Sequence, residues 1–130
     1  MRNVKLLLVE DDLDLLTDLV IFLSSNYLVF TAGDSREAVN IFEKTQTDCC
    51  VIDINLPHFL NERNEYEGLA LAEEMYARGI NKPAIIFISQ TPFPKGTSTV
   101  PDYKFFRKPL KVSDLLDTIA ASTPESLYRV

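Results

Sequence analysis

The sequence predicts an α/β fold: a doubly wound, five-stranded parallel sheet in the order 2-1-3-4-5. Short, continuously apolar runs alternate along the 130 residues with longer amphipathic runs, and acidic or other polar residues follow several of the short runs. Continuous apolar runs are typical of strands that are covered on both faces. Their alternation with helices implies right-handed crossovers and therefore a parallel sheet.

The first half of the chain carries three predicted strands and two predicted helices. The strands are expected at residues 4–9, 27–32 and 49–52. After the first strand, apolar residues recur at helical spacing on one stripe: Leu15, Leu16, Leu19, Val20 and Leu23. Asp34, followed three residues later by Glu37, has the pattern of a capping box. It begins a helix that carries Ala38, Val39, Ile41 and Phe42.

The second half continues the same alternation. Strands are expected at residues 84–89 and 103–106. A helix between residues 68 and 84 presents Leu69, Ala72 and Met75, and a last helix after Lys111 presents Leu115, Leu116 and Ile119. Residues 1–122 are expected to form one domain, with residues 123–130 as a C-terminal tail or linker stub.

Composition narrows the class of function. The formal net charge of −6 argues against a nucleic-acid surface, which needs clustered Lys and Arg. The chain has no signal-like N-terminus and no apolar run of membrane-spanning length, so we expect a cytoplasmic protein with no membrane association. Cys49 and Cys50 are adjacent and point to opposite faces of a strand, which indicates two buried apolar residues.

Polar residues gather at the carboxyl ends of the predicted strands, where ligands bind in open parallel sheets. They are Glu10-Asp11-Asp12 after strand one, Asp53 after strand three, Ser89 after strand four and Lys108 after strand five. Because strands one and three are neighbours in this order, the carboxylates of Glu10, Asp11 and Asp53 are expected to converge. Several carboxylates in one pocket repel one another unless a cation or a raised pKa relieves them. Oxygen ligands with room for water suit Mg²⁺.

Each of these residues also has a purely structural interpretation. The three acids after strand one suit a helix N-terminus, and alone they favour a cap over a metal site. Asp53 and Ser89 equally suit turns, and Lys108 suits a solvated surface. Their coincidence at the ends of four strands favours one shared site.

Four motifs together carry a family resemblance: LLLVEDD, DCCVID, IIFIS and FFRKPL. From residue 4 to about residue 121, the chain resembles the receiver domain of two-component response regulators. The resemblance implies a flavodoxin-like fold and a phosphoacceptor in a two-component system or phosphorelay. It also implies partners: a histidine kinase or phosphotransfer protein as donor, and a downstream protein or an output domain as target. Such a domain is no enzyme beyond catalysing its own phosphorylation and dephosphorylation.

The resemblance implies roles for individual residues. Asp53 matches the phosphoacceptor, Asp11 a direct Mg²⁺ ligand and Glu10 an acid that completes the pocket largely through water. The backbone carbonyl of Asn55 matches a further ligand. Lys108 matches the family's lysine, which with Mg²⁺ neutralises charge on the transferring phosphoryl group.

Ser89 and Phe105 match the family's switch residues. The Ser89 hydroxyl would hydrogen-bond a phosphoryl oxygen and so change a distant surface. Phe105 suits a core position on strand five equally well. Gln90 is bulkier than the residue typical of its position and is expected to restrict access to the phosphoryl group. With Asn55 and Thr91 it is expected to set the lifetime of the phosphorylated state.

Two segments depart from the family pattern. Residues 57–68 are longer than the usual turn, and Glu62, Arg63, Glu65 and Glu67 indicate a solvated loop or helical extension rather than a catalytic insert. Between Ser89 and Lys108 the sequence contains Pro92, Pro94, Gly96 and Pro101, which make a regular helix improbable. We therefore expect the fourth helix of the family to be altered or missing, and with it the common mode of dimerisation.

Two other functions remain open. The first is a receiver fold that acts as a phosphorylation-independent protein-binding module, although a costly carboxylate cluster argues against a pure scaffold. The second is a phosphatase of the haloacid-dehalogenase type, which requires Asp-x-Asp after its first strand. Here the order is Asp53-Ile54-Asn55 after the third strand, so the general acid of that class is missing.

Overall fold

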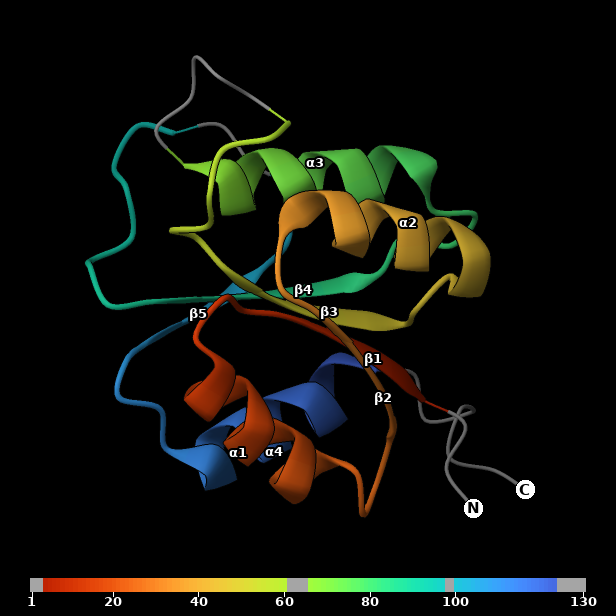
Figure 1. The fold of residues 1–130 in the computed structure, drawn as a ribbon, viewed down its shortest axis with the longest axis vertical. Helices are drawn as coiled ribbons and strands as arrows, with labels where there is room; N and C mark the ends of the chain where they lie inside the picture. Colours follow the sequence, from red (N-terminus) through yellow and green to blue (C-terminus); the bar gives the residue numbers. More distant parts are fainter. Residues whose placement is uncertain (1–3, 61–65, 98–99, 124–130) are drawn as a thin grey trace.

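The computed structural model describes residues 4–60, 66–97 and 100–123 and contains one parallel five-stranded sheet (Figure 1). Its strands are β1 (Lys5–Val9), β2 (Leu28–Ala32), β3 (Cys49–Asp53), β4 (Ala84–Ser89) and β5 (Lys104–Arg107). The order is β2-β1-β3-β4-β5, and every neighbouring pair is parallel. The predicted α/β fold and strand order are confirmed.

Helices cover both faces of the sheet, as the doubly wound arrangement requires (Figure 1). On one face lie α2 (Ser35–Thr45) and α3 (Glu67–Arg78), and on the other lie α1 (Leu13–Leu23) and α4 (Val112–Ser122). Each face has its own core, because alternate residues of a strand point to opposite sides. Leu7 and Cys50 pack towards α2 and α3, whereas Leu6 and Cys49 pack towards α1 and α4. Both cysteines are free and buried, as predicted.

Acidic residues cap the first two helices. Asp12 is the N-cap of α1, and its carboxylate accepts hydrogen bonds from the amides of Asp14 and Leu15. Asp34 caps α2 by accepting from the Glu37 amide at 3.0 Å, and this bond lowers the pKa of Asp34. Asp12 is therefore a helix cap, as the structural alternative for the three acids proposed. Glu10 and Asp11 do not cap α1 and remain as candidates for a site at the end of β1.

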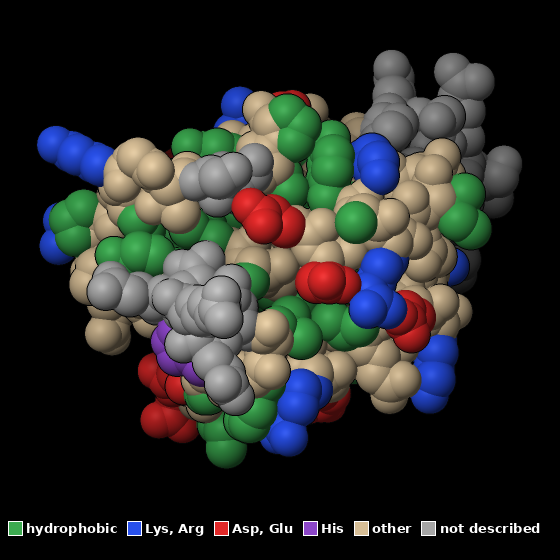
Figure 2. All heavy atoms as spheres, turned by 90° about the horizontal axis from the view of Figure 1, so that it is seen from above, with side chains coloured by type: hydrophobic (Ala, Val, Ile, Leu, Met, Phe, Trp, Pro, Cys, Tyr) green, Lys and Arg blue, Asp and Glu red, His purple; other side chains and the backbone are tan. Residues whose placement is uncertain are grey.

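The outer face of α2 and α3 carries mixed charge. Figure 2 shows acidic and basic side chains interspersed over the described residues of this face, without a continuous basic patch. Arg78 of α3 pairs with Glu43 of α2 and with Glu74 one turn earlier. The residues described on this face therefore form no positive cluster of the kind that a nucleic-acid surface needs.

The segment between β4 and β5 contains no helix in its described residues, 90–97 and 100–103, which agrees with the prediction that the family's fourth helix is altered or missing. The label α4 therefore belongs to the helix after β5. Phe93 and Val100 pack against the core on the α2 and α3 side. The Phe93 ring stacks on Tyr103 at 4.9 Å between centroids and meets the edge of Phe105 at 5.3 Å. An aromatic cluster thus covers this part of the sheet where a helix is missing.

Residues 124–130 of the predicted tail lie outside the described residues. Thr123 is buried, and its hydroxyl donates a hydrogen bond to the Ile119 carbonyl at 3.0 Å. This residue therefore packs with the end of α4. No helix among the described residues is long and apolar enough to span a membrane.

Candidate functional site

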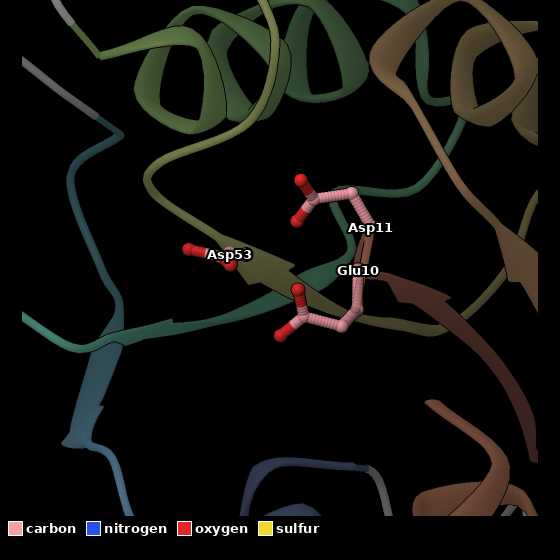
Figure 3. Close-up of side chains that lie close together, drawn as sticks. All are labelled: Glu10, Asp11 and Asp53. Atoms are coloured by element: carbon pink, nitrogen blue, oxygen red, sulfur yellow. The ribbon is translucent and has the colours of Figure 1, made fainter. Parts of the chain in front are cut away.

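Three carboxylates meet at the carboxyl edge of the sheet (Figure 3). Glu10 and Asp11 directly follow β1, and Asp53 is the last residue of β3. Because β1 and β3 pair directly, their ends bring these side chains together, with one oxygen of each within 4.8 Å of the others. Glu10 and Asp53 are buried at 1% and 4% exposure, whereas Asp11 is exposed. The predicted convergence is present.

Lys108 brings a positive charge between the two buried acids. Its ammonium donates to Glu10 Oε1 at 2.5 Å and to Asp53 Oδ2 at 3.0 Å. The Lys108 backbone amide donates to the Ser89 carbonyl at 2.8 Å, which holds the residue beside the end of β4. The Lys108–Pro109 peptide bond is cis. One lysine therefore compensates two carboxylates from different strands.

The pKa values of this group follow from burial and pairing. Burial raises the pKa of Glu10 to about 7; the hydrogen bond from Lys108 opposes the rise and the neighbouring Asp53 adds to it. Burial pulls down the pKa of Lys108, but its hydrogen bonds to Glu10 and Asp53 outweigh this, so the net shift is upwards. Near neutral pH, Glu10 is therefore poised between its charged and neutral forms.

A network of neutral polar groups borders the acids. The Asn55 side-chain amide donates to Ser89 Oγ at 2.9 Å and to Thr91 Oγ1 at 3.3 Å. The two hydroxyls lie 2.9 Å apart, and the Thr91 backbone amide also donates to Ser89 Oγ. Ser89 is fully buried. Its hydroxyl thus has partners already, and any new ligand of this group must compete with Asn55 and Thr91.

The acids, Lys108 and Asn55 border an open pocket of about 200 Å³. Its lining consists of Glu10, Asp11, Asp12, Asp53, Asn55, Gln90 and Lys108. This donor set fits Mg²⁺, since it offers hard carboxylate oxygens and space for water molecules. Asp53 Oδ1 also accepts a hydrogen bond from the backbone amide of Asn55 at 2.9 Å, which orients the carboxylate.

Of the remaining predicted site residues, Gln90 lines the pocket and Phe105 does not. Gln90 is exposed, and its carbonyl accepts a hydrogen bond from Arg107 Nε at 3.2 Å. Phe105 lies half-buried against the core with its ring edge on Phe93. Phe93 was not singled out from the sequence; its position between two prolines favoured an irregular segment and carried no signal of packing.

The burial of Glu67 contradicts one expectation from the sequence. It was expected in a solvated segment, but its side chain is fully buried at the start of α3. Ser35, Phe59 and Leu60 donate hydrogen bonds to its carboxylate. Ser35 lies 32 residues earlier, whereas Phe59 and Leu60 lie eight and seven residues earlier in the same polar segment. The polar composition of that segment indicated exposure, but these contacts bury the group. Glu62, Arg63 and Glu65 lie outside the described residues.

Comparison with known proteins agrees with this geometry. The sequence matches the family model of the response regulator receiver domain over residues 6–120. The chain therefore belongs to the response regulator receiver domain family, whose members are signalling domains of two-component systems.

Solved structures share the fold at low sequence identity. A response regulator receiver protein from Sinorhizobium medicae has a TM-score of 0.75 at 22% identity, covering 91% of this chain and 92% of that one. A signal receiver domain of a putative Luxo repressor protein from Vibrio parahaemolyticus has a TM-score of 0.73 at 19% identity, over 94% and 90%. A CheY-like receiver domain protein from Methanospirillum hungatei has a TM-score of 0.70 at 22% identity, over 91% of each chain.

Proposed function

We propose that this chain is an active phosphoacceptor receiver that takes a phosphoryl group onto Asp53. The observation that supports it most is the contact of one ammonium, Lys108, with both Glu10 and Asp53 beside an open acidic pocket. A buried carboxylate pair of this kind is costly for a module that only binds proteins. The presence of this costly carboxylate pair is explained if the two acids take part in a reaction.

In the proposed reaction an Asp53 oxygen attacks the phosphorus atom of a phosphohistidine on a partner protein. The new P–O bond forms as the P–N bond breaks, and the leaving imidazole nitrogen keeps the electron pair and takes a proton from water. Lys108 stabilises the negative charge of the phosphoryl oxygens. In the separate dephosphorylation step water attacks phosphorus, the bond between phosphorus and the Asp53 oxygen breaks, and inorganic phosphate leaves the free carboxylate.

Mg²⁺ is the proposed cofactor, held by Asp11 and Asp53, by Glu10 largely through water, and by the Asn55 backbone carbonyl. When bound, it would neutralise charge on the phosphoryl oxygens. The carboxylates of Glu10, Asp11 and Asp53 support this assignment through their mutual proximity. Lys108 already neutralises part of the charge of Glu10 and Asp53, which keeps the pocket stable without the ion.

Ser89 is proposed to sense the phosphoryl group. To donate a hydrogen bond to a phosphoryl oxygen, its hydroxyl must exchange the contacts that it now makes with Asn55 and Thr91. Such an exchange displaces the segment after β4, which contacts Phe105 through Phe93. Phe105 is therefore proposed as the residue that transmits the change to the surface.

The proposal includes partners of two kinds. A histidine kinase or phosphotransfer protein supplies the phosphoryl group, and a downstream protein or an output domain reads the state of the switch. We further propose that residues 1–122 form the receiver unit and that it acts in the cytoplasm, where such donors hold their phosphoryl groups.

The second candidate function is a phosphorylation-independent binding module. The segment between β4 and β5 favours it, because an aromatic cluster has replaced a helix there and gives the domain a different surface. In that case Ser89 and Phe105 would keep one state regardless of Asp53.

The test is intact-mass analysis after incubation with phosphoramidate or acetyl phosphate and Mg²⁺. We expect one added phosphoryl group on the unsubstituted chain. We expect none when EDTA removes Mg²⁺ and none on the Asp53→Asn variant. Because Gln90 lines the pocket, a negative result with small donors must be followed by a panel of phosphorylated kinases. No adduct with either would overturn the phosphoacceptor function in favour of the binding module.

A further inference from the structure

Glu67 is a buried carboxylate that the proposed reaction does not use. It is fully buried at the first position of α3, and its Oε2 accepts hydrogen bonds from three other positions. Ser35 Oγ, at the start of α2, donates at 2.5 Å. The backbone amides of Phe59 and Leu60 each donate at 2.7 Å. One oxygen therefore joins α2, α3 and the segment that follows the phosphoacceptor strand.

The next residue connects this group to the phosphoacceptor. The Gly68 amide donates to the Ile54 carbonyl at 3.0 Å. A Cβ atom on Gly68 would lie 2.2 Å from the Asp53 carbonyl oxygen, so the first turn of α3 directly contacts the backbone of Asp53 and Ile54. Any displacement of Glu67 is therefore passed to the residues that carry the acidic pocket.

The residues held by Glu67, Phe59 and Leu60, follow the pocket residue Asn55 by four and five positions. Phe59 and Leu60 are exposed at 44% and 38%, so burial of their own side chains does little to hold them. The Arg36 guanidinium lies 3.6 Å from the Phe59 ring centre and adds a second contact with α2. The backbone of residues 59 and 60 is thus held by polar contacts that converge on Glu67.

Stability alone is a poor reason for this arrangement. Burying a carboxylate costs free energy that its hydrogen bonds only partly return, and an apolar residue of similar volume is often at least as stabilising. What a carboxylate provides is direction, because a hydroxyl of α2 and two consecutive backbone amides must point to one oxygen.

We propose that Glu67 is a positioning residue for the phosphoacceptor pocket. Through Gly68 it fixes the backbone of Asp53 and Ile54, and through Phe59 and Leu60 it fixes the segment after Asn55. This inference rests on the proposed function of the pocket as a Mg²⁺ and phosphoryl site, and it adds a residue outside that pocket. Loss of the carboxylate is expected to weaken Mg²⁺ binding without removing any ligand.

The experiment compares Glu67→Ala, Glu67→Gln and Glu73→Gln with the unsubstituted chain. Glu73 is an exposed glutamate of the same helix and is the matched control. Mg²⁺ affinity is measured by calorimetry, and amide hydrogen exchange at Phe59 and Leu60 is followed without the ion. Outer residues that orient ligands typically change metal affinity tenfold or more, so we expect about a tenfold loss in Glu67→Ala. Glu67→Gln keeps an acceptor oxygen and is expected to lose less.

A second control separates positioning from general stability. Met75→Ala removes a buried side chain of α3 two turns away and is expected to lower the unfolding midpoint while leaving Mg²⁺ affinity unchanged. The proposal is overturned if Met75→Ala weakens Mg²⁺ binding as much as Glu67→Ala. It is also overturned if both Glu67 variants bind Mg²⁺ normally while exchange at Phe59 and Leu60 is accelerated. Failure of the unsubstituted chain to bind Mg²⁺ would instead contradict the proposed function itself.

Discussion

Lys108 Nζ lies 3.0 Å from Asp53 Oδ2, although the two residues are 55 positions apart in the sequence. The same ammonium lies 2.5 Å from Glu10 Oε1. The proposed phosphoacceptor therefore shares its counter-charge with a second buried acid. A change to Lys108 or to either acid should therefore alter metal binding in the pocket.

Replacing Lys108 by Met should have opposite effects on stability and on metal binding. We expect the free energy of unfolding to fall by about 3 kcal/mol at pH 8, because breaking a buried pair leaves carboxylates uncompensated. Mg²⁺ affinity should rise, since a competing positive charge is gone. Urea unfolding and calorimetry measure the two effects, with exposed Lys111→Met as the control. At pH 6 the stability loss should be smaller, since Glu10 then takes up a proton and needs less compensation. An equal loss of stability at pH 6 and pH 8 would contradict the pairing of Lys108 with a charged Glu10.

Mg²⁺ affinity should depend on pH through Glu10. Its pKa is raised to about 7, and a carboxylate must lose its proton to attract the ion, so affinity should rise between pH 6 and pH 8. Without the ion, the folded state holds this proton more tightly than the unfolded state. The contribution of Glu10 to stability should therefore fall as pH rises from about 4.5 to about 7. Calorimetry of Glu10→Gln tests this, because its affinity should be nearly constant over the same range.

Gln90→Ala should speed exchange of the phosphoryl group with small molecules. The Gln90 side chain is exposed and lines the pocket, so its removal opens a path to Asp53. We expect labelling by phosphoramidate and loss of the label to water each to be about threefold faster, equivalent to about 0.6 kcal/mol in the barrier. Time-resolved intact-mass spectra measure both rates. Lys95→Ala, exposed in the same segment, is the control, and unchanged rates in Gln90→Ala would show that Gln90 does not restrict access.

Phe93→Ala should loosen the segment between β4 and β5. The ring contacts Phe87, Tyr103 and Phe105, and its removal leaves a gap over the sheet. We expect a loss of about 2 kcal/mol in the free energy of unfolding, below the value for a fully buried ring because Phe93 is half-buried. Denaturant unfolding measures the loss, and near-ultraviolet circular dichroism follows the environment of Tyr103. Phe22→Ala, on the exposed side of α1, should change stability little.

Gly68→Ala should displace the backbone that carries the phosphoacceptor. Its Cβ would lie 2.2 Å from the Asp53 carbonyl oxygen, and a backbone atom cannot give way as a side chain does. We expect a loss of about 2 kcal/mol or more in stability, typical of overpacked sites. Gly33→Ala is the control, because the nearest atom to its added Cβ is 4.0 Å away. Equal stability of the two variants in urea would contradict the close contact of α3 with β3.

Much of the fold could be predicted from local patterns. The strand at residues 84–89 was predicted with both of its ends, and the other strands agree to within one residue at either end. The prolines after Ser89 excluded a helix before β5, since proline removes a hydrogen-bond donor and blocks the preceding turn. These features depend on residues that are neighbours in sequence, on continuous apolar runs for the buried strands and on proline for the irregular segment, so they are visible in the sequence.

The candidate site was predicted only in outline. Strand ends placed Glu10, Asp11 and Asp53 together because the order of the strands determines which ends are neighbours. The contact of Asn55 with Ser89, 34 residues later, gave no sequence signal, because it depends on side-chain rotamers at two strand ends. Glu67 was assigned to the wrong environment because its burial depends on Ser35, 32 residues earlier, and on the backbone amides of Phe59 and Leu60, which local composition does not reveal.

By itself, the sequence determined the strands, the helices and the acids that follow the strands, because these follow from apolar periodicity and the geometry of parallel strands. The order of the sheet was what the resemblance to receiver domains implied. Only the tertiary structure decided that Lys108 contacts both Glu10 and Asp53, that Phe93 covers the sheet where a helix is missing, and that Glu67 is buried. Those contacts join segments far apart in the chain, and they form only when the packed core brings the segments within hydrogen-bonding distance.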